Sequence, residues 1–362
     1  MHTLKFECEV VTPMFLAGAD GITPELRAPS IKGAMRFWWR AMNGHLSIDK
    51  LREKEAEIFG GSGEKEGKSK VSIRINSTQI KKSETLWEEI GYDEKTAKKS
   101  GKKYKIPKKE NGIAYLLYSV FMLTERPYIK SDSKFEIIFT SFDEEALKKA
   151  INSFKILSIF GGLGSRVRRG AGSFVVTKGL ENNFYGQNIK TPSELKNYIE
   201  GVVKPLLKGS QKPCKHSVLK NAKIYIFEPK ENWKKALESI GEPFADFRQN
   251  HKDRIIETPM FGFPIRHRNK SLFGAAPDPN KKDRKGNVVD FLERRASPLV
   301  FKVIKTEKNC FIPVILRFND KFIPNNYKIT DKKGQKFDNP NNRIIDEFFN
   351  DLKTNIKEEV EL

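Results

Sequence analysis

Cysteine, histidine and long apolar runs are all scarce in this sequence. Its three cysteines, Cys8, Cys214 and Cys310, lie far apart and lack the C-x-x-C spacing of a zinc site. Their number and spacing do not suggest a disulfide framework and best fit a reducing, cytoplasmic setting. The longest apolar run, around 113–123, is far shorter than the roughly 20 residues that a membrane-spanning helix needs. We therefore expect this run to be buried core.

The scarcity of histidine argues against catalysis. A metal-independent ribonuclease needs a general base and a general acid beside the scissile phosphate, and histidine often supplies them. The sequence has five histidines, no two of them close in the chain: His2, His45, His216, His251 and His267. No carboxylates cluster as metal ligands, and no nucleophile elbow is present. We expect no catalytic residue, no metal and no cofactor.

Basic residues, in contrast, are abundant. Lys and Arg number 67 against 46 Asp and Glu, which gives a formal net charge of +21. A surface of this charge attracts polyanions, with nucleic acid as the first candidate partner and an anionic membrane as the second. The length of 362 residues predicts two domains.

Alternating apolar residues in the first half predict the element order βαββαβ. Four strands are expected near 4–10, 71–76, 134–139 and 174–176, with helices at about 30–44 and after Asp143, which we predict as an N-cap. This order is that of the ferredoxin-like fold, an antiparallel sheet with two helices on one face. The open face of such a sheet commonly binds nucleic acid. The Lys-rich insertion at 81–109 is expected to be a solvated, mobile loop.

The second half predicts a degraded copy of this unit. Thr191 and Glu194 form a capping box for one helix. The further elements are a strand at 223–227, a short helix after Glu231, a hairpin of 299–304 with 311–318, in which Pro313 favours an edge position, and a final helix carrying Ile344 to Ile356. We expect a boundary near 179–187, hence ferredoxin-like domains at 1–180 and 181–362, and a disordered loop at 262–287.

The first stretch that indicates a function is Glu25–Arg40. Ser30 is the predicted N-cap, and Ile31, Met35, Trp38 and Met42 would form an apolar stripe. Lys32, Arg36 and Arg40 would form a cationic stripe that presents charge to a phosphate chain. We expect Trp38 in the core. For Trp39 two alternatives remain open, a core position and an exposed ring that stacks on a base.

The second stretch, Phe160–Phe174, interleaves glycines with arginines; we refer to it as the Gly-Arg loop. Glycines allow positive φ and a close approach of backbone N–H groups to an anion. The loop lacks the lysine of a Walker motif, and a flexible turn with solvated arginines remains the alternative. We expect Arg166, Arg168 and Arg169 to be solvated, to contact phosphates, and to form one surface with the cationic stripe.

These motifs resemble those of the repeat-associated mysterious protein (RAMP) superfamily. The Gly-Arg loop resembles its glycine-rich signature, and Ile58–Ser62 followed by the strand at Val71 is also similar. The segment from Leu26 to Arg40 resembles, more particularly, the first-numbered RAMP subunits of Cmr (type III-B) CRISPR effector complexes.

The resemblance implies a non-catalytic, structural subunit that binds guide RNA and target single-stranded RNA beside other RAMP subunits. The RNA-binding residues we expect are Arg27, Lys32, Arg36, Trp39, Arg40, Gly162, Gly164, Arg166, Arg168 and Arg169. Two alternatives stay open, a metal-independent guide-processing endoribonuclease of the same superfamily and a basic scaffold without direct RNA contact.

Overall fold

The computed structural model describes residues 1–63, 66–97, 100–109, 111–179, 189–207, 216–254, 256–263, 265–266, 271–277, 292, 294–307, 310–319, 323, 326–331, 336–337 and 343–362. Within these residues lie three four-stranded antiparallel sheets and two short two-stranded ones. None of the described helices is both long and apolar enough to cross a membrane.

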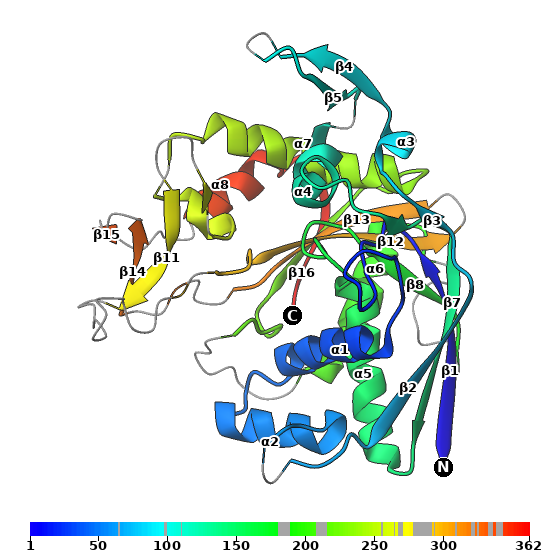
Figure 1. The fold of residues 1–362 in the computed structure, drawn as a ribbon. Helices are drawn as coiled ribbons and strands as arrows, with labels where there is room; N and C mark the ends of the chain where they lie inside the picture. The colour runs from blue at the N-terminus through cyan, green and yellow to red at the C-terminus, as the bar shows by residue number, and fades with distance from the viewer. Residues whose placement is uncertain are drawn as a thin grey trace, which may run out of the picture.

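The first sheet has the strand order β2-β7-β1-β8 (Figure 1). Its strands are β1 His2–Val10, β2 Val71–Gln79, β7 Lys134–Ser141 and β8 Phe174–Lys178. Three helices accompany it, α1 Ala28–Met42, α2 Ile48–Phe59 and α5 Glu144–Phe160. Phe154 of α5 packs on Phe6 and Phe139, with ring centroids 5.5 and 5.1 Å apart. The predicted βαββαβ elements are therefore all present, and α2 is an addition.

The helix caps were predicted with mixed success. The Asp143 carboxylate accepts a hydrogen bond from the backbone N–H of Ala146, which confirms it as the N-cap of α5. The prediction for Ser30 was wrong, because α1 begins two residues earlier and its N-cap is Arg27, which makes no side-chain cap. Pro29 explains the shift, since its fixed φ and missing N–H suit the first turn of a helix.

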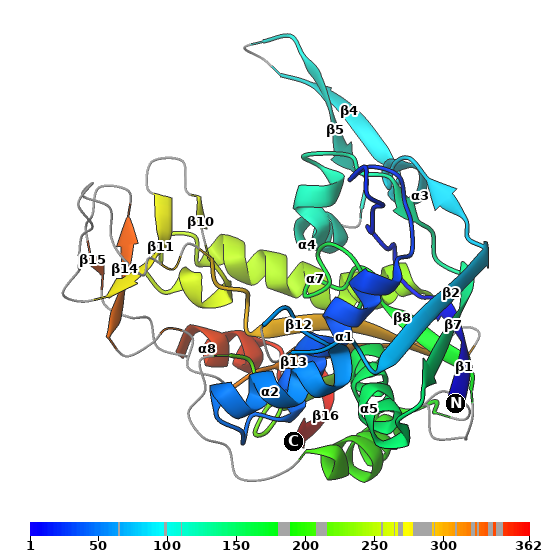
Figure 2. The same cartoon turned by 60° about the horizontal axis from the view of Figure 1, so that its bottom comes forward.

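The described residues of the insertion between β2 and β7 form helices and strands, so the expectation of a loop was wrong. Its elements are β3 Lys82–Ser83, α3 Trp87–Ile90, β4 Tyr92–Thr96, β5 Lys103–Pro107, α4 Asn111–Phe121 and β6 Tyr128–Ile129. The hairpin β4–β5 projects from the body in both Figure 1 and Figure 2. The apolar run is helix α4, and its buried residues confirm that it is core.

The second large sheet has the strand order β12-β13-β9-β16. Its strands are β9 Lys223–Phe227, β12 Leu299–Glu307, β13 Cys310–Arg317 and β16 Ile356–Glu361, and its helices are α7 Trp233–Asn250 and α8 Arg343–Asp351. In chain order these six elements are again βαββαβ. Helix α6, Pro192–Tyr198, precedes them with the predicted capping box of Thr191 and Glu194.

Several details of the second half differ from the prediction. Helix α7 has 18 residues rather than being short. Helix α8 ends at Asp351, and Ile356 opens strand β16, which the helical reading of this segment missed. Strand β13 is central, not at an edge. Pro313 is tolerated there because pairing with β9 begins one residue later, at Val314.

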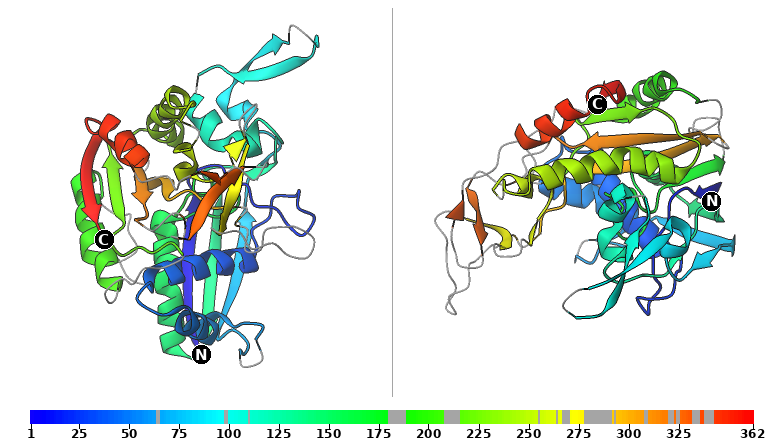
Figure 3. Two further views of the ribbon diagram at one scale, coloured as in Figure 1. Left: turned by 90° about the vertical axis from the view of Figure 1, so that its left-hand side faces the viewer. Right: turned by 90° about the horizontal axis from the view of Figure 1, so that it is seen from above.

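A third sheet, β10-β11-β14-β15, stands apart from the body (Figure 3). Its strands are β10 Ile265–Arg266, β11 Ser271–Pro277, β14 Tyr327–Asp331 and β15 Lys336–Phe337. The loop expected at 262–287 lies largely outside the described residues, although part of it forms β10 and β11. The expected boundary at 179–187 lies outside them too, except for Gly179.

Helices α4 and α7 bring the two halves of the chain together at a pair of glycines. A Cβ on Gly112 would lie 2.8 Å from the Cα of Glu242, and one on Gly241 would lie 2.9 Å from the carbonyl carbon of Gly112. The carboxylate of Glu238 accepts hydrogen bonds of 2.8 Å from the backbone N–H groups of Gly112 and Ile113. The first turn of α4 is thus capped by α7.

A buried lysine forms a second link between the halves. Lys302 of β12 is 2% exposed, and its Nζ donates to the Gly161 carbonyl at 2.6 Å. Its ammonium also lies 5.6 Å from the ring centroid of Phe174. Burial lowers the pKa of Lys302 to about 7.

The close crossing of α4 and α7 at Gly112 and Gly241 predicts that substitution by alanine has opposite effects on stability at Gly112 and at Gly33. Gly112→Ala should lower the free energy of unfolding by about 1–3 kcal/mol, because the added methyl group meets backbone that cannot move aside. Gly33→Ala is the matched control, since a Cβ there meets nothing within 4 Å. It should raise stability by up to about 1 kcal/mol, through helix propensity. Urea denaturation measures both, and equal midpoints would contradict the crossing.

Lys302 predicts a pH dependence of stability. Its pKa is lowered from 10.5 to about 7 on folding. Between these values the unfolded chain binds a proton that the folded protein does not, so stability should rise with pH. Relative to Lys302→Met, the wild type should gain stability from about pH 7 to about pH 10. Lys149→Met controls for loss of an exposed ammonium group, and parallel curves for wild type and Lys302→Met would refute the assignment.

Candidate nucleic-acid interface

Helix α1 carries the predicted cationic stripe. Lys32, Arg36 and Arg40 are spaced four residues apart and are all half-buried. Trp38 is in the core as expected, at 4% exposed. Trp39 is also 4% exposed, so the alternative of an exposed stacking ring is wrong. It faces inward because the apolar stripe of α1 packs against both α2 and α5.

The stripe is organised by one carboxylate from α2. Both Glu55 oxygens accept from Nη1 of Arg40 at 2.8 Å, and one also accepts from Nε of Arg36. The Glu55 side chain is 5% exposed, whereas those of Arg36 and Arg40 are 36% and 37% exposed. One buried negative charge thus lies behind two positive charges that reach the surface.

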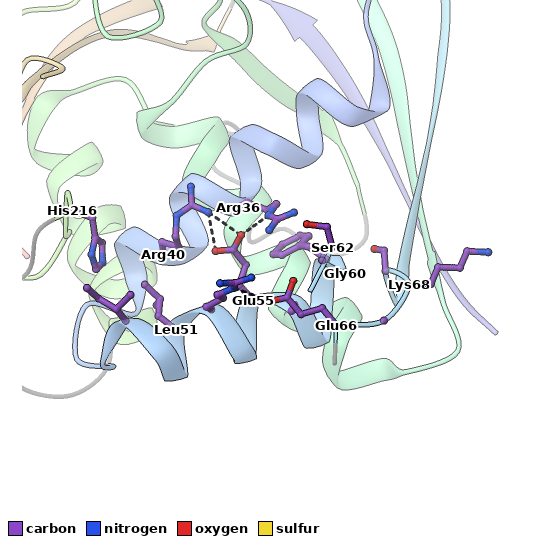
Figure 4. Close-up of a pocket in the computed structure, with 16 residues that line it drawn as sticks. Arg36, Arg40, Leu51, Glu55, Gly60, Ser62, Glu66, Lys68 and His216 are labelled. Carbon is purple, nitrogen blue, oxygen red and sulfur yellow. Dashed lines mark hydrogen bonds and ion pairs between the residues drawn. The ribbon is translucent and has the colours of Figure 1, made fainter. Parts of the chain in front are cut away.

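These residues line a pocket of about 820 Å³ between α1, α2 and the loop that follows α2. Figure 4 shows Arg36 and Arg40 converging on Glu55, with His216 on the far side of Arg40. Four basic side chains line the pocket against two carboxylates: Arg36, Arg40, Arg52 and Lys68 against Glu55 and Glu66. We call it the α1–α2 pocket; its excess of positive charge suits a polyanion.

The surroundings of the pocket shift the pKa values of its edge residues. Burial, and then the nearby Arg36, lower the pKa of Lys32, whose Nζ donates to Ser69 Oγ at 3.0 Å. Burial, followed by the charges of Arg40 and Arg295, lowers the pKa of His216, which favours its neutral form. The N–H of Gly63, and then Arg52, lower the pKa of Glu66 and keep it ionised.

The open face of the first sheet, the face on which this fold commonly binds nucleic acid, is lined by paired charges. It carries acidic residues on β1 and β7, each held by a lysine. Glu136 pairs with Lys5 at 2.6 Å, and Glu9 pairs with Lys305 of β12. No aromatic residue of the described sheet is among the exposed large hydrophobic side chains. A face of paired charges without exposed rings has little to stack or attract RNA.

The Gly-Arg loop has the predicted glycine geometry but uses its donors internally. Gly164, Gly170 and Gly172 have φ of 95°, 88° and 66°, values that favour glycine. The N–H groups of Leu163, Ser165, Arg169, Gly170 and Gly172 all donate to carbonyls of the protein. Because these five N–H groups already have carbonyl partners, they do not form the expected anion-binding nest, and that expectation was wrong for them.

The three loop arginines are half-buried and bonded to other parts of the protein, which corrects the expectation that they are solvated. Arg166 donates from Nε to the Leu116 carbonyl at 2.9 Å. Arg168 donates to the Ser297 carbonyl, and its guanidinium lies 5.3 Å from the ring centroids of both Phe37 and Phe318. These partners lie in α4 and beside β12 and β13, so both arginines hold other segments against the loop.

Arg169 is likewise bonded within the protein. Its Nη2 donates to the Phe261 carbonyl at 2.8 Å, and its guanidinium lies 5.0 Å from the Phe244 ring centroid. Burial, and then the charge of Arg166, lower the pKa of Arg169 to about 9. The backbone bridge between Arg169 and Phe301 and the bond from the Phe301 N–H to the Arg168 carbonyl at 3.1 Å join the loop to β12.

Two glycines of the loop lie away from the α1–α2 pocket. Gly162 and Gly164 line a separate cleft of about 690 Å³ with Ser30 and Ala34, which lie on another side of α1. This cleft shares no lining residue with the α1–α2 pocket. Arg27 is half-buried at the N-terminal end of α1 and lines neither of the two.

Sequence reasoning missed the residues that complete the pocket. Helix α2 was not predicted, so Glu55 and Arg52 were overlooked. A signal existed, because Glu55 follows Leu51 by four residues and precedes Phe59 by four, on the buried face of α2. A carboxylate in an apolar stripe indicates a buried ion pair. His216 lies far away in the sequence and carried no signal of this kind.

Comparisons with known proteins cover the whole chain. The family model described as the RAMP superfamily matches residues 7–175. The CRISPR system Cmr subunit Cmr1-2 of Pyrococcus furiosus is 32% identical over 191 residues, which are 49% of this chain and 96% of that protein. The crystal structure of Cmr1 from Pyrococcus furiosus in its apo form matches with a TM-score of 0.64 and 21% identity, covering 100% of this chain and 98% of that one.

A third match comes from a larger assembly. A chain in the cryo-EM structure of the type III-B Cmr-beta complex bound to cognate target RNA matches with a TM-score of 0.55 and 16% identity. The match covers 89% of this chain and 96% of that one, and at this identity it shows a shared fold. The match to Cmr1-2, at 32% identity, spans nearly the whole length of that relative. This chain therefore belongs to the Cmr1 family of the RAMP superfamily.

Proposed function

We propose that this chain is a structural RNA-binding subunit of a type III-B CRISPR effector complex. Its relative is a Cmr subunit, and its fold recurs in a Cmr complex bound to target RNA. The observation that carries the RNA-binding part is the α1–α2 pocket, in which four basic side chains outnumber two carboxylates. The partners we propose are guide RNA, target single-stranded RNA and other RAMP subunits.

We further propose that the chain is two ferredoxin-like domains, residues 1–180 and 181–362. Numbered within its own half, each large sheet has the strand order 2-3-1-4. The second βαββαβ unit is complete once β16 is included. The second domain is then less degraded than its sequence suggests, and its two insertions, one before β12 and one after β13, together form the third sheet.

In this proposal RNA contacts come from α1 and α2. Lys32, Arg36 and Arg40 contact phosphates, and Arg52 and Lys68 extend the positive surface along the pocket. Such contacts position RNA without reading its sequence, so affinity is nearly independent of sequence and falls with salt. The loop arginines support this surface indirectly, since their guanidiniums are engaged with backbone carbonyls.

We propose that the subunit is not an enzyme, and the guide-processing endoribonuclease remains the second candidate. His216 is the one residue of the pocket that supports the ribonuclease, because a neutral histidine beside arginines can act as a general base. No second histidine lines the pocket, and the described residues contain no group of three potential metal ligands. Cleavage of labelled RNA by the pure protein that disappears in His216→Ala would favour the ribonuclease.

The α1–α2 pocket predicts the salt dependence of RNA binding. Replacing Arg36 and Arg40 by Met and Glu55 by Gln removes both contacts without leaving a buried carboxylate unpaired. The slope of log affinity for single-stranded RNA against log salt should fall by about one to two units. Filter binding across a salt series measures it.

Arg74→Gln is the control for this experiment, because it also lowers the net charge by one but changes an exposed residue of β2. Its slope should stay close to that of the wild type. An unchanged slope in the triple variant, or the same loss in the control, would contradict RNA binding at the pocket.

A further inference from the structure

Glu55 is an unusual residue for a surface that binds RNA. Among the described residues it is the only carboxylate less than a tenth exposed, at 4%. It lies directly behind the two arginines to which phosphate contacts are assigned. Burying a charge costs free energy unless it is paired, and its negative charge also opposes the approach of a phosphate. Its presence at this position therefore calls for an explanation.

The hydrogen bonds of Glu55 fix the direction of both guanidiniums. The carboxylate engages Nε of Arg36 and Nη1 of Arg40, and both of its oxygens take part. Charge-assisted bonds of this kind hold the planar group in a defined orientation. Both side chains remain more than a third exposed on the pocket side, which leaves room for a ligand at their outer edges.

We propose that Glu55 is a positioning residue that holds Arg36 and Arg40 as a preformed clamp for an RNA phosphodiester. This inference rests on the proposed RNA-binding function and assigns the α1–α2 pocket its ligand group. Without Glu55 the two like-charged guanidiniums repel each other and sample many rotamers, and RNA has to order them on binding. With Glu55 this ordering cost is met during folding, and the pair keeps a net charge of about +1 toward the phosphate.

A second role for Glu55 is purely structural, tying α2 to α1. The two roles predict different signs for RNA affinity. Removing any carboxylate near a polyanion site adds positive charge and, by charge alone, strengthens binding. A variant of a positioning residue weakens binding despite the added charge, because the clamp loses its geometry.

The test compares two substitutions that change the charge equally. Glu55→Gln and Glu53→Gln lie on the same helix, but Glu53 is exposed and does not line the pocket. We expect Glu55→Gln to weaken binding of labelled single-stranded RNA on the order of 10-fold. Glu53→Gln should leave binding unchanged or strengthen it. Melting temperatures of both variants confirm that the folded protein is measured, and Glu55→Asp replaces Glu55→Gln if that variant does not fold.

A double-mutant cycle separates positioning from stability. In the background of Arg36→Lys and Arg40→Lys, which keeps cations beside the buried carboxylate but removes both guanidiniums, Glu55→Gln should cost no further affinity, because there is no clamp left to orient. An equal loss in both backgrounds, or an affinity of Glu55→Gln at or above that of the wild type, would overturn the positioning role. Wild-type protein that does not bind RNA would instead refute the proposed function itself.

Discussion

Basic side chains that donate to backbone carbonyls hold the two large sheets together. Lys302 of β12 donates to the Gly161 carbonyl, and Arg168 and Arg169 donate to carbonyls beside the second sheet. These basic groups have backbone carbonyls and aromatic rings as partners, although Nη1 of Arg169 is buried without a hydrogen-bond partner in the described part of the chain. The Gly-Arg loop is therefore a joint, and its glycines serve close packing: a Cβ on Gly172 would collide with the backbone of Leu163.

This joint determines which basic surface remains for a ligand. Because the loop arginines are bonded within the protein, the more accessible arginines of the two basic motifs are Arg36 and Arg40 of α1, beside α2. There Glu55 offsets part of the charge and orders the rest. Positive charge in this protein thus has two separate uses, internal cohesion at the joint and recognition in the α1–α2 pocket. Net charge alone does not distinguish them, since both contribute to the same total of +21.

The sequence was sufficient for the elements whose signal is local. Strand alternation, the Asp143 cap and the capping box at Thr191 depend on neighbours within a few residues, and all were predicted. Strand β16 was missed because apolar residues at 344–356 continue at helical spacing across the end of α8. The loop arginines were misjudged because their partners, such as Ser297 and Phe261, are distant in sequence. The α1–α2 pocket was not predicted because helix α2, which forms one of its walls, was not predicted. The overlooked sign of α2 and of its ion pair was Glu55 within an apolar stripe.

Hydrogen–deuterium exchange of the pure protein, with and without single-stranded RNA, tests the central claim most directly. The account predicts that RNA slows exchange in the second half of α1, in α2 and in the described part of the loop at 60–69. Exchange should not change at Leu163, Ser165, Arg169, Gly170 and Gly172 of the Gly-Arg loop, because their N–H groups are already bonded within the protein. Protection centred on residues 161–173, with none in α1 and α2, would contradict the account.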